Sequence, residues 1–193
     1  MRSEGTYRTF LAIDPPEAVR REMGRIQEQM KRTVRGLIRW IHPEGIHLTL
    51  KFFGDITGDD ITRIADAAEQ EATTKKPLEL QVKTVGVFPD LKRPRVVWLG
   101  MAGDVDRLLA LQTALDKRFA ALGFPKEDRP FRAHLTLGRI KTSKGLLGMA
   151  QAVEQGAAAE AGSFRAAGLT LFKSDLKPAG AVYTKLAEFP FGG

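Results

Sequence analysis

The sequence predicts a mixed fold of strands and helices built from two similar halves. Hydrophobic residues alternate in some segments, as in strands, and recur every three or four positions in others, as in helices. The tetrapeptide His-Leu-Thr-Leu occurs twice, at His47 and at His134, so the copies are separated by nearly half of the 193 residues. Each copy follows a predicted helix of about four turns. We therefore expect a duplicated unit.

The first half is expected to hold three strands and two helices. Asp14 is a good N-cap for the first helix, Pro15 suits the first turn, and Glu17 completes a capping-box spacing. Apolar residues then recur on one helical face from Val19 to Met30. The expected elements are a strand at 9–13, this helix, a short strand at 37–41, a stronger strand at 47–53, and a helix opened by Asp59 and Asp60.

The elements after these begin with two strands joined by a proline-rich, charged turn at 88–94. Asp104 is expected to cap the helix that follows, and Gly123 is expected to end it. The expected elements are strands at 78–87 and 95–99, the helix after Asp104, a strand at 134–138, a weak glycine-interrupted helix at 143–155, and strands at 164–172 and 181–189.

Composition excludes several classes of protein. Apolar residues make up 43% and charged residues 27%, as in an average soluble globular domain. No apolar run approaches the roughly 18 residues of a transmembrane helix, and the apolar stretch near the N-terminus is too short for a signal peptide. Cysteine is absent, which excludes disulfides, a thiol nucleophile and cysteine-ligated zinc. We expect a cytoplasmic protein with no membrane partner.

The charge balance favours a polyanionic partner. Lys and Arg number 30 against 23 Asp and Glu, a net charge of +7. A path for an RNA backbone and an ordinary solvated basic surface explain these residues equally well. Trp98 lies in an apolar strand and is expected to pack in the core, whereas the role of Trp40 stays open. The basic residues nearest the motifs are Arg39, Lys51, Arg93, Arg95, Arg129, Arg132, Arg139, Lys141 and Lys144.

The repeated tetrapeptide has a defined geometry in a strand. Side chains alternate between faces, so His47 and Thr49 point one way while the two leucines point into the core. The second copy places His134 and Thr136 in the same way. A single His-x-Thr is typical of an ordinary amphipathic strand, but two identical copies are improbable by chance. His42, the third histidine, is interpreted as a surface or loop residue.

Two imidazoles and two hydroxyls facing one groove suit acid–base catalysis on a phosphate. One imidazole accepts a proton from the nucleophile and the other donates one to the leaving oxygen, since the pKa of histidine lies near neutrality. Threonine hydroxyls donate to the non-bridging oxygens, where negative charge develops. This scheme needs no metal. The sequence has no P-loop, dinucleotide fingerprint or hydrolase nucleophile elbow.

These motifs resemble the 2H phosphoesterase superfamily, and specifically its bacterial and archaeal RNA 2′,3′-cyclic phosphodiesterase branch, also called the 2′-5′ RNA ligase family. The chain departs from the usual pattern at Phe53, where leucine is commoner, and at Ala133, where proline is frequent. The resembling segments are 9–14 at the first strand, 47–54 at the first motif, 93–100 at the middle strand, 129–139 at the second motif, and 171–176 with Gly180 and Tyr183 at the C-terminal hairpin.

The resemblance implies an α+β fold with two pseudo-symmetric lobes, each an antiparallel sheet with outer helices, facing across a central groove. Residues 1–193 would form one bilobal domain with two His-x-Thr-x repeats. The resemblance also implies that His47 is the proton donor, that His134 is the proton acceptor, and that Thr49 and Thr136 bind the phosphate.

Arg139 matches a family arginine that contacts phosphate. Strict alternation places it on the face opposite His134 and Thr136, but a bulge at Gly138 would redirect it. Arg132 has the correct parity but no strong support from the family pattern.

The implied reaction is hydrolysis of an RNA terminal 2′,3′-cyclic phosphate to a 2′-phosphate, without cofactor or obligate protein partner. Its reverse would join RNA ends through a 2′-5′ bond. The alternatives are an RNA-binding module without turnover and a phosphodiesterase acting on small cyclic or 2′,5′-linked nucleotides. Spacing alone does not say which histidine is the acid.

Overall fold

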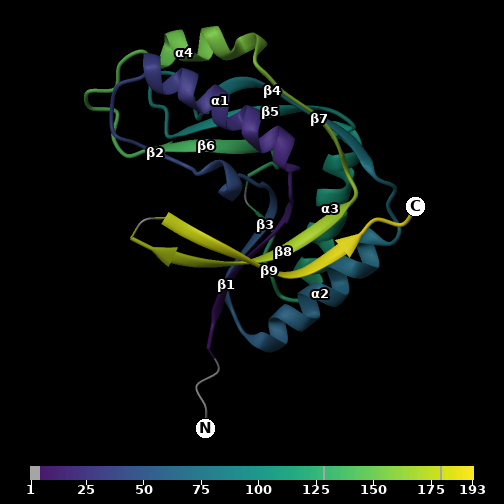
Figure 1. Cartoon of the computed structure of the whole chain (residues 1–193). Coiled ribbons are helices and arrows are strands. Elements are labelled where there is room, and N and C mark those ends of the chain that lie inside the picture. Colours follow the sequence, from purple (N-terminus) through teal and green to yellow (C-terminus); the bar gives the residue numbers. More distant parts are fainter. Residues whose placement is uncertain (1–4, 128, 179) are drawn as a thin grey trace.

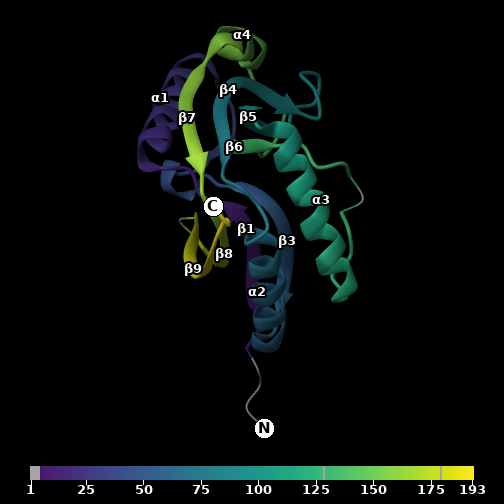
Figure 2. The same cartoon turned by 90° about the vertical axis from the view of Figure 1, so that its right-hand side faces the viewer.

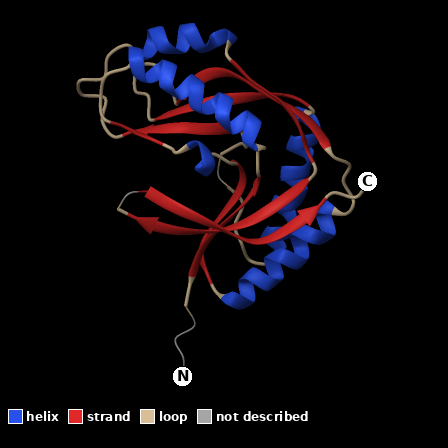
Figure 3. Ribbon diagram, viewed as in Figure 1, coloured by secondary structure: helices blue, strands red, loops and turns tan. Residues whose placement is uncertain are grey.

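The fold consists of two antiparallel sheets facing each other, with helices around them (Figures 1 and 3). It is seen in a computed structural model that describes residues 5–127, 129–178 and 180–193. The four-stranded sheet has the order β3-β1-β8-β9 and the five-stranded sheet the order β2-β6-β5-β4-β7. The strands are β1 (Tyr7–Ile13), β2 (Ile38–Trp40), β3 (Leu48–Ile56), β4 (Leu78–Phe88), β5 (Val96–Gly103), β6 (His134–Ile140), β7 (Glu160–Ala166), β8 (Gly168–Lys177) and β9 (Gly180–Pro190).

The helices lie outside the two sheets. The α-helices are α1 (Glu17–Thr33), α2 (Gly58–Ala72), α3 (Val105–Ala121) and α4 (Met149–Gln155), and two short 3₁₀ turns are η1 (Pro43–Gly45) and η2 (Gly156–Ala158). Helices α1 and α4 cover the five-stranded sheet, α1 packing on β7 and α4 on β4. Helix α2 packs on β8, β9 and α3, and α3 runs along both sheets (Figure 2). The α+β fold with two antiparallel sheets is therefore confirmed.

Apolar side chains of both sheets join in one buried cluster. The leucines of the two repeated motifs belong to it: Leu48 and Leu135 have no exposed surface, and Leu50 and Leu137 are also buried. Leucine side chains that bury fully in this way contribute about 2 kcal/mol each to folding. The motif strands are thus anchored as the alternation predicts, with histidine and threonine left on the other face.

The first helix begins later than the sequence predicts. Its N-cap is Pro16, in an extended conformation, and the helix starts at Glu17. Two consecutive prolines keep the chain extended before the helix, since the residue preceding a proline disfavours the helical region. The prediction that Asp14 caps this helix is wrong, and its carboxylate has charged partners instead: Arg20 and Lys185.

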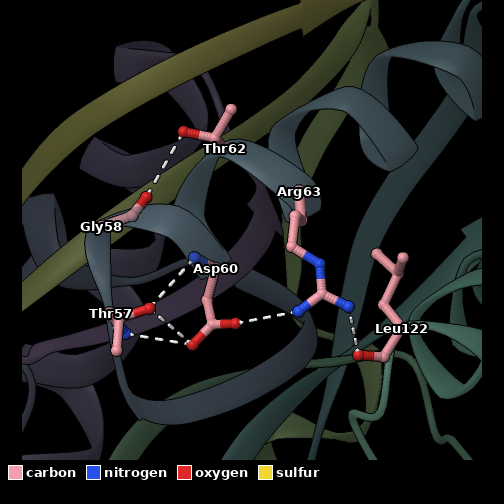
Figure 4. A network of polar contacts seen from close by, with 6 residues as sticks. All are labelled: Thr57, Gly58, Asp60, Thr62, Arg63 and Leu122. Atoms are coloured by element: carbon pink, nitrogen blue, oxygen red, sulfur yellow. Dashed lines mark hydrogen bonds and ion pairs between the residues drawn. The ribbon is translucent and has the colours of Figure 1, made fainter.

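Helix α2 begins with a complete capping box (Figure 4). The backbone N–H of Asp60 donates to Thr57 Oγ1 at 3.2 Å, and the backbone N–H of Thr57 donates to Asp60 Oδ2 at 3.2 Å. Arg63 donates to Asp60 Oδ1 and to the Leu122 carbonyl oxygen at 2.8 Å, which ties α2 to the end of α3. The helix therefore starts near the predicted aspartate pair, but Thr57 caps it.

Two predicted elements of the second half are corrected. The helix expected over 143–155 forms only from Met149, because Gly145 and Gly148 adopt left-handed backbone angles (φ 73° and 76°) that interrupt a helix. The strand expected over 164–172 is two strands, β7 and β8, which belong to different sheets. The strand-forming pattern of this segment carries no signal for such a change of sheet, since both strands bury residues in the same core.

Candidate active site

His47 directly precedes β3, at the edge of the four-stranded sheet, and is 8% exposed. Its Nδ1 lies 3.0 Å from the Gly45 carbonyl oxygen in η1. Three aromatic rings surround the imidazole, with centroid distances of 5.7 Å to Phe10, 4.4 Å to Phe172 and 5.2 Å to Tyr183. The ring is therefore fixed by one backbone bond and by packing on three sides.

His134 is the first residue of β6 in the facing sheet, and it is half-buried. Its Nδ1 lies 2.6 Å from the Arg132 carbonyl oxygen. The ring of Phe88 meets the imidazole edge-on at 5.0 Å, and Arg132 in turn lies over the Phe88 ring. His134 is thus fixed by the same kind of hydrogen bond as His47, but its side chain is less buried.

The two copies of the repeated tetrapeptide also form the same hydrogen bond. In both motifs Nδ1 faces the carbonyl oxygen of the residue two positions earlier. A carbonyl only accepts, so Nδ1 carries the hydrogen, and Nε2 is left to accept or donate a proton. The sequence indicated acid–base chemistry, but nothing in it shows which ring nitrogen is available.

A β-bulge in β6 redirects Arg139. Thr136 pairs with Trp98 of β5 and Gly138 with Val97, so Leu137 is an extra residue in β6. The bulge reverses the alternation beyond it, which returns Arg139 to the face of Thr136. The bulge expected at Gly138 is therefore present.

The first repeat has the same bulge at the matching position. Thr49 pairs with Ala12 of β1 and Lys51 with Leu11, so Leu50 is the extra residue. Phe52 consequently occupies the place that Arg139 has in the second repeat, and it is 52% exposed. Sequence reasoning missed Phe52, although its offset from His47 equals that of Arg139 from His134.

The two motifs line one groove with a volume of about 1680 Å³. The groove contains both histidines, both threonines and Arg139, and the exposed Phe52 also lines it. Its walls are mainly basic. The remaining arginine and lysine residues that line it are Arg8, Arg21, Arg25, Lys31, Arg32, Arg39, Lys51, Arg129 and Arg132, against Glu28, Glu44 and Glu127.

The basic and tryptophan residues singled out in the sequence have different roles. Lys51 is only 4% exposed and binds Asp116 of α3 at 2.7 Å, so its role is structural. Trp40 lines the groove, with Lys31 over its ring. Trp98 packs flat over Gly86, where a Cβ would overlap the indole ring. Arg93, Arg95, Lys141 and Lys144 are not among the described residues that line the groove.

Burial and nearby cations disfavour the charged form of both histidines. The pKa of His47 is lowered to about 4, first by burial and then by Arg20, while the Gly45 carbonyl acts in the opposite direction and Lys185 lowers it further. The pKa of His134 is also lowered, first by burial; the Arg132 carbonyl opposes this and Arg139 adds to it. Both imidazoles are therefore mainly neutral at neutral pH.

Asp14 lies on the Nε2 side of the His47 ring. Its Oδ1 is 3.6 Å from His47 Nε2, its Oδ2 is 3.3 Å from Lys185 Nζ, and it also contacts Arg20. Across the described ranges, no three His, Cys, Asp or Glu side chains group as metal ligands. No helix in these ranges has the length and apolar character needed to cross a membrane.

A family model described as LigT like Phosphoesterase matches residues 13–98 and again residues 99–183. Each matched segment contains one of the two motifs. The chain belongs to the LigT-like phosphoesterase family. The duplication expected from the tetrapeptide thus corresponds to two copies of the LigT-like unit.

Similar proteins agree with this membership. A protein of Methanothermobacter thermautotrophicus named RNA 2′,3′-cyclic phosphodiesterase is 35% identical over 94% of this chain and 97% of its own length. One of Aquifex aeolicus with the same name is 29% identical over 96% of this chain and 98% of its own. Among solved structures, TT0787 of Thermus thermophilus is similar with a TM-score of 0.77 and 27% identity, covering 96% of this chain and 98% of that one. E. coli LigT complexed with 3′-AMP, at 22% identity, covers 98% of this chain and 99% of its own and shares the fold with a TM-score of 0.72.

Proposed function

We propose that this chain hydrolyses the 2′,3′-cyclic phosphate at an RNA end to a 2′-phosphate. The observation that carries the proposal is the pair of His-x-Thr motifs in one groove, each with Nδ1 bonded to a backbone carbonyl and Nε2 left for proton transfer. The relatives named RNA 2′,3′-cyclic phosphodiesterase support the same reaction.

The reaction needs one acid and one base on opposite sides of the phosphorus. Water attacks in line while Nε2 of His134 takes its proton. The bond between phosphorus and the 3′ oxygen breaks, and Nε2 of His47 protonates that oxygen. Each histidine ends in the protonation state in which the other began, and exchange with solvent resets both.

Three side chains are proposed to hold the phosphate. Thr49 and Thr136 present hydroxyls beside the two histidines, and Arg139 presents a guanidinium after the bulge. Donors fixed before the reaction stabilise the charge that develops on the non-bridging oxygens, because they need no reorganisation at that moment. No metal or cofactor takes part in this scheme.

The size and charge of the groove support an RNA end over a mononucleotide. Sites for small molecules usually have volumes of about 300–1,000 Å³, and this groove has about 1680 Å³. Its basic walls suit several phosphates. A binding module without turnover would have no use for a paired acid and base. The reverse reaction, with an RNA 5′-OH in place of water, would form a 2′-5′ bond by microscopic reversibility.

We also propose that residues 1–193 form one bilobal domain, which is supported by the single apolar cluster that joins both sheets. The cytoplasmic location stays a prediction from composition.

The test uses an RNA oligonucleotide ending in a 2′,3′-cyclic phosphate, incubated in EDTA with wild type, His47→Ala and His134→Ala. We expect a 2′-phosphate from the wild type and a loss of at least about a hundredfold in each variant. The phosphate position is determined by NMR of the product. A 3′-phosphate would reverse the assignment of the leaving oxygen, and no conversion of any cyclic substrate would leave only a binding role.

A further inference from the structure

Asp14 is a carboxylate that the sequence assigned to helix capping and that the structure places elsewhere. It directly follows β1, and its side chain is 19% exposed. It meets two cations, Arg20 of α1 and Lys185 of β9, and the imidazole of His47 directly before β3. A carboxylate this enclosed needs charged partners, because burying it without them is costly.

The cationic side chains that face His47 oppose its protonation, whereas the carboxylate of Asp14 and the Gly45 carbonyl favour it. Arg20 and Lys185 act as cations from α1 and β9, and Tyr183 of β9 meets the ring edge-on. Glu44 of η1 acts on Arg20 rather than on the imidazole directly. Among the described residues, Asp14 is the acidic side chain that contacts His47, and it also neutralises both cations.

The two histidines therefore differ in their charged neighbours, although their motifs are identical. Nε2 of His47 faces a carboxylate oxygen at 3.6 Å. His134 has the cation Arg139 as its charged neighbour, whereas His47 has two cations, Arg20 and Lys185, together with the carboxylate of Asp14. At His47 both ring nitrogens face acceptor oxygens, since the Gly45 carbonyl bonds Nδ1. A carbonyl bonded to Nδ1 and a carboxylate near Nε2 favour the ring that carries both hydrogens.

We propose that Asp14 is a positioning residue that favours the protonated form of His47, the proposed proton donor. This inference rests on the proposed function. The separation of 3.6 Å exceeds a hydrogen bond, so Asp14 acts through its charge and leaves the Nε2 hydrogen available for the leaving oxygen. Burial and the two cations lower the pKa of His47, so the ring is mainly neutral at neutral pH. In this proposal the negative charge of Asp14 makes that lowering smaller than it would otherwise be.

The first measurement does not depend on turnover. The chain has three histidines, so their NMR signals can be assigned with His42 and His134 variants. Asp14→Asn should lower the pKa of His47 by about one unit and leave that of His134 unchanged. Lys185→Gln removes a cation and should raise the pKa of His47, by less, because Lys185 is 49% exposed. Asp175→Asn, a carboxylate of β8 paired with Lys173, is the matched control and should move neither.

The second measurement is kcat/KM for the cyclic-phosphate RNA across pH. At pH 8 the protonated fraction of His47 falls tenfold for each unit of lost pKa, so Asp14→Asn should be about tenfold slower. The deficit should shrink as the pH falls toward the pKa of His47. Lys185→Gln should be faster than wild type at pH 8.

The outcomes separate the two proposals. A deficit in Asp14→Asn that is the same at every pH, with the His47 titration unchanged, would mean that Asp14 has only a structural role. If Asp14→Asn does not fold, an unchanged His47 pKa in Lys185→Gln overturns the charge argument. If wild type has no turnover, the proposed function fails while the NMR titration still decides whether Asp14 controls His47.

Discussion

In His47 and His134, the local backbone determines which ring nitrogen carries the hydrogen. Each imidazole has Nδ1 against a carbonyl oxygen fixed by the chain two residues earlier. No side-chain substitution removes that carbonyl, so the tautomer is a property of the fold rather than of one partner residue. In the proposed mechanism, proton transfer is consequently confined to Nε2 in both rings.

The pH optimum follows from the two lowered pKa values. Burial is the main cause for both, and it brings the pKa of His47 to about 4. In the proposed mechanism His47 must be protonated and His134 neutral, so the protonated fraction of His47 falls above its pKa and the neutral fraction of His134 falls below its pKa. We expect kcat/KM to be greatest below pH 6.5, measured from pH 4 to 9 in one buffer series. An optimum above pH 7 would contradict the stated environment of the two rings.

Arg139 should matter for phosphate binding. Arg139→Gln removes a guanidinium from the face of His134 and Thr136, and a charge-assisted contact of this kind is worth about tenfold to a hundredfold in kcat/KM. Arg165→Gln, an exposed arginine of β7 outside the lining of the groove, is the control. Equal losses in the two variants would show that general positive charge, rather than a phosphate contact, is responsible.

At the scale of elements, the candidate site depends on β-bulges in its two motif strands and on a capped helix that supports one of the sheets. The bulge at Leu137 places Arg139, and its counterpart at Leu50 places Phe52 on the opposite wall. Helix α2 supports the four-stranded sheet from outside, and its first turn is closed by Thr57. The pKa of Asp60 is lowered first by its bonds to Thr57 and also by Arg63, so the capping box weakens as the pH falls through the range where Asp60 is protonated.

Thr57→Ala should reduce the free energy of unfolding by about 1 kcal/mol, since it leaves the Asp60 N–H without its acceptor. Urea unfolding at pH 7 measures this loss. Thr62→Ala, one turn later in α2, is the matched control, because its hydroxyl only donates to a helical carbonyl at 3.4 Å. Alanine favours helices, so this control should lose nothing. A loss of the same size in both variants would argue against the cap.

At the scale of the whole molecule, the groove runs well beyond the two motifs. Arginines of α1, β2 and the segment before β6 line it, together with Trp40. An aromatic ring among cations is the arrangement on which single-stranded RNA stacks and binds its backbone. Hydrolysis of a terminal phosphate should therefore depend on the nucleotides that precede it.

We expect kcat/KM to be higher for an RNA oligonucleotide than for a mononucleotide cyclic phosphate, and this advantage should fall as salt rises. Each phosphate contact contributes about −0.7 to the logarithmic salt slope. Arg39→Gln, on β2 at the groove wall, should make the slope shallower by roughly one contact, with Arg165→Gln as control. A salt dependence identical for the two substrates would place the RNA strand outside the groove.

Much of this arrangement could be predicted from sequence, for identifiable reasons. The buried leucines and outward histidines follow from strand alternation, which is local. Gly138 signalled the bulge in β6, but Lys51 occupies the matching place in β3, so only the pairing with β1 reveals the bulge there. The prediction for Asp14 fails because capping is a local pattern, whereas its partners Arg20 and Lys185 come from elements that only the tertiary fold brings to it.

The distribution of strands between the sheets has a consequence for the origin of the molecule. Residues 13–98 supply β2 and β4 to one sheet and β3 to the other, while residues 99–183 supply β6 and β7 to the first and β8 to the second. Neither half supplies all the strands of a sheet. An ancestral half-length polypeptide with this topology would have required a second copy to complete each layer. Gene fusion would then have made that pairing permanent, and separated halves of the present chain should fold only when mixed.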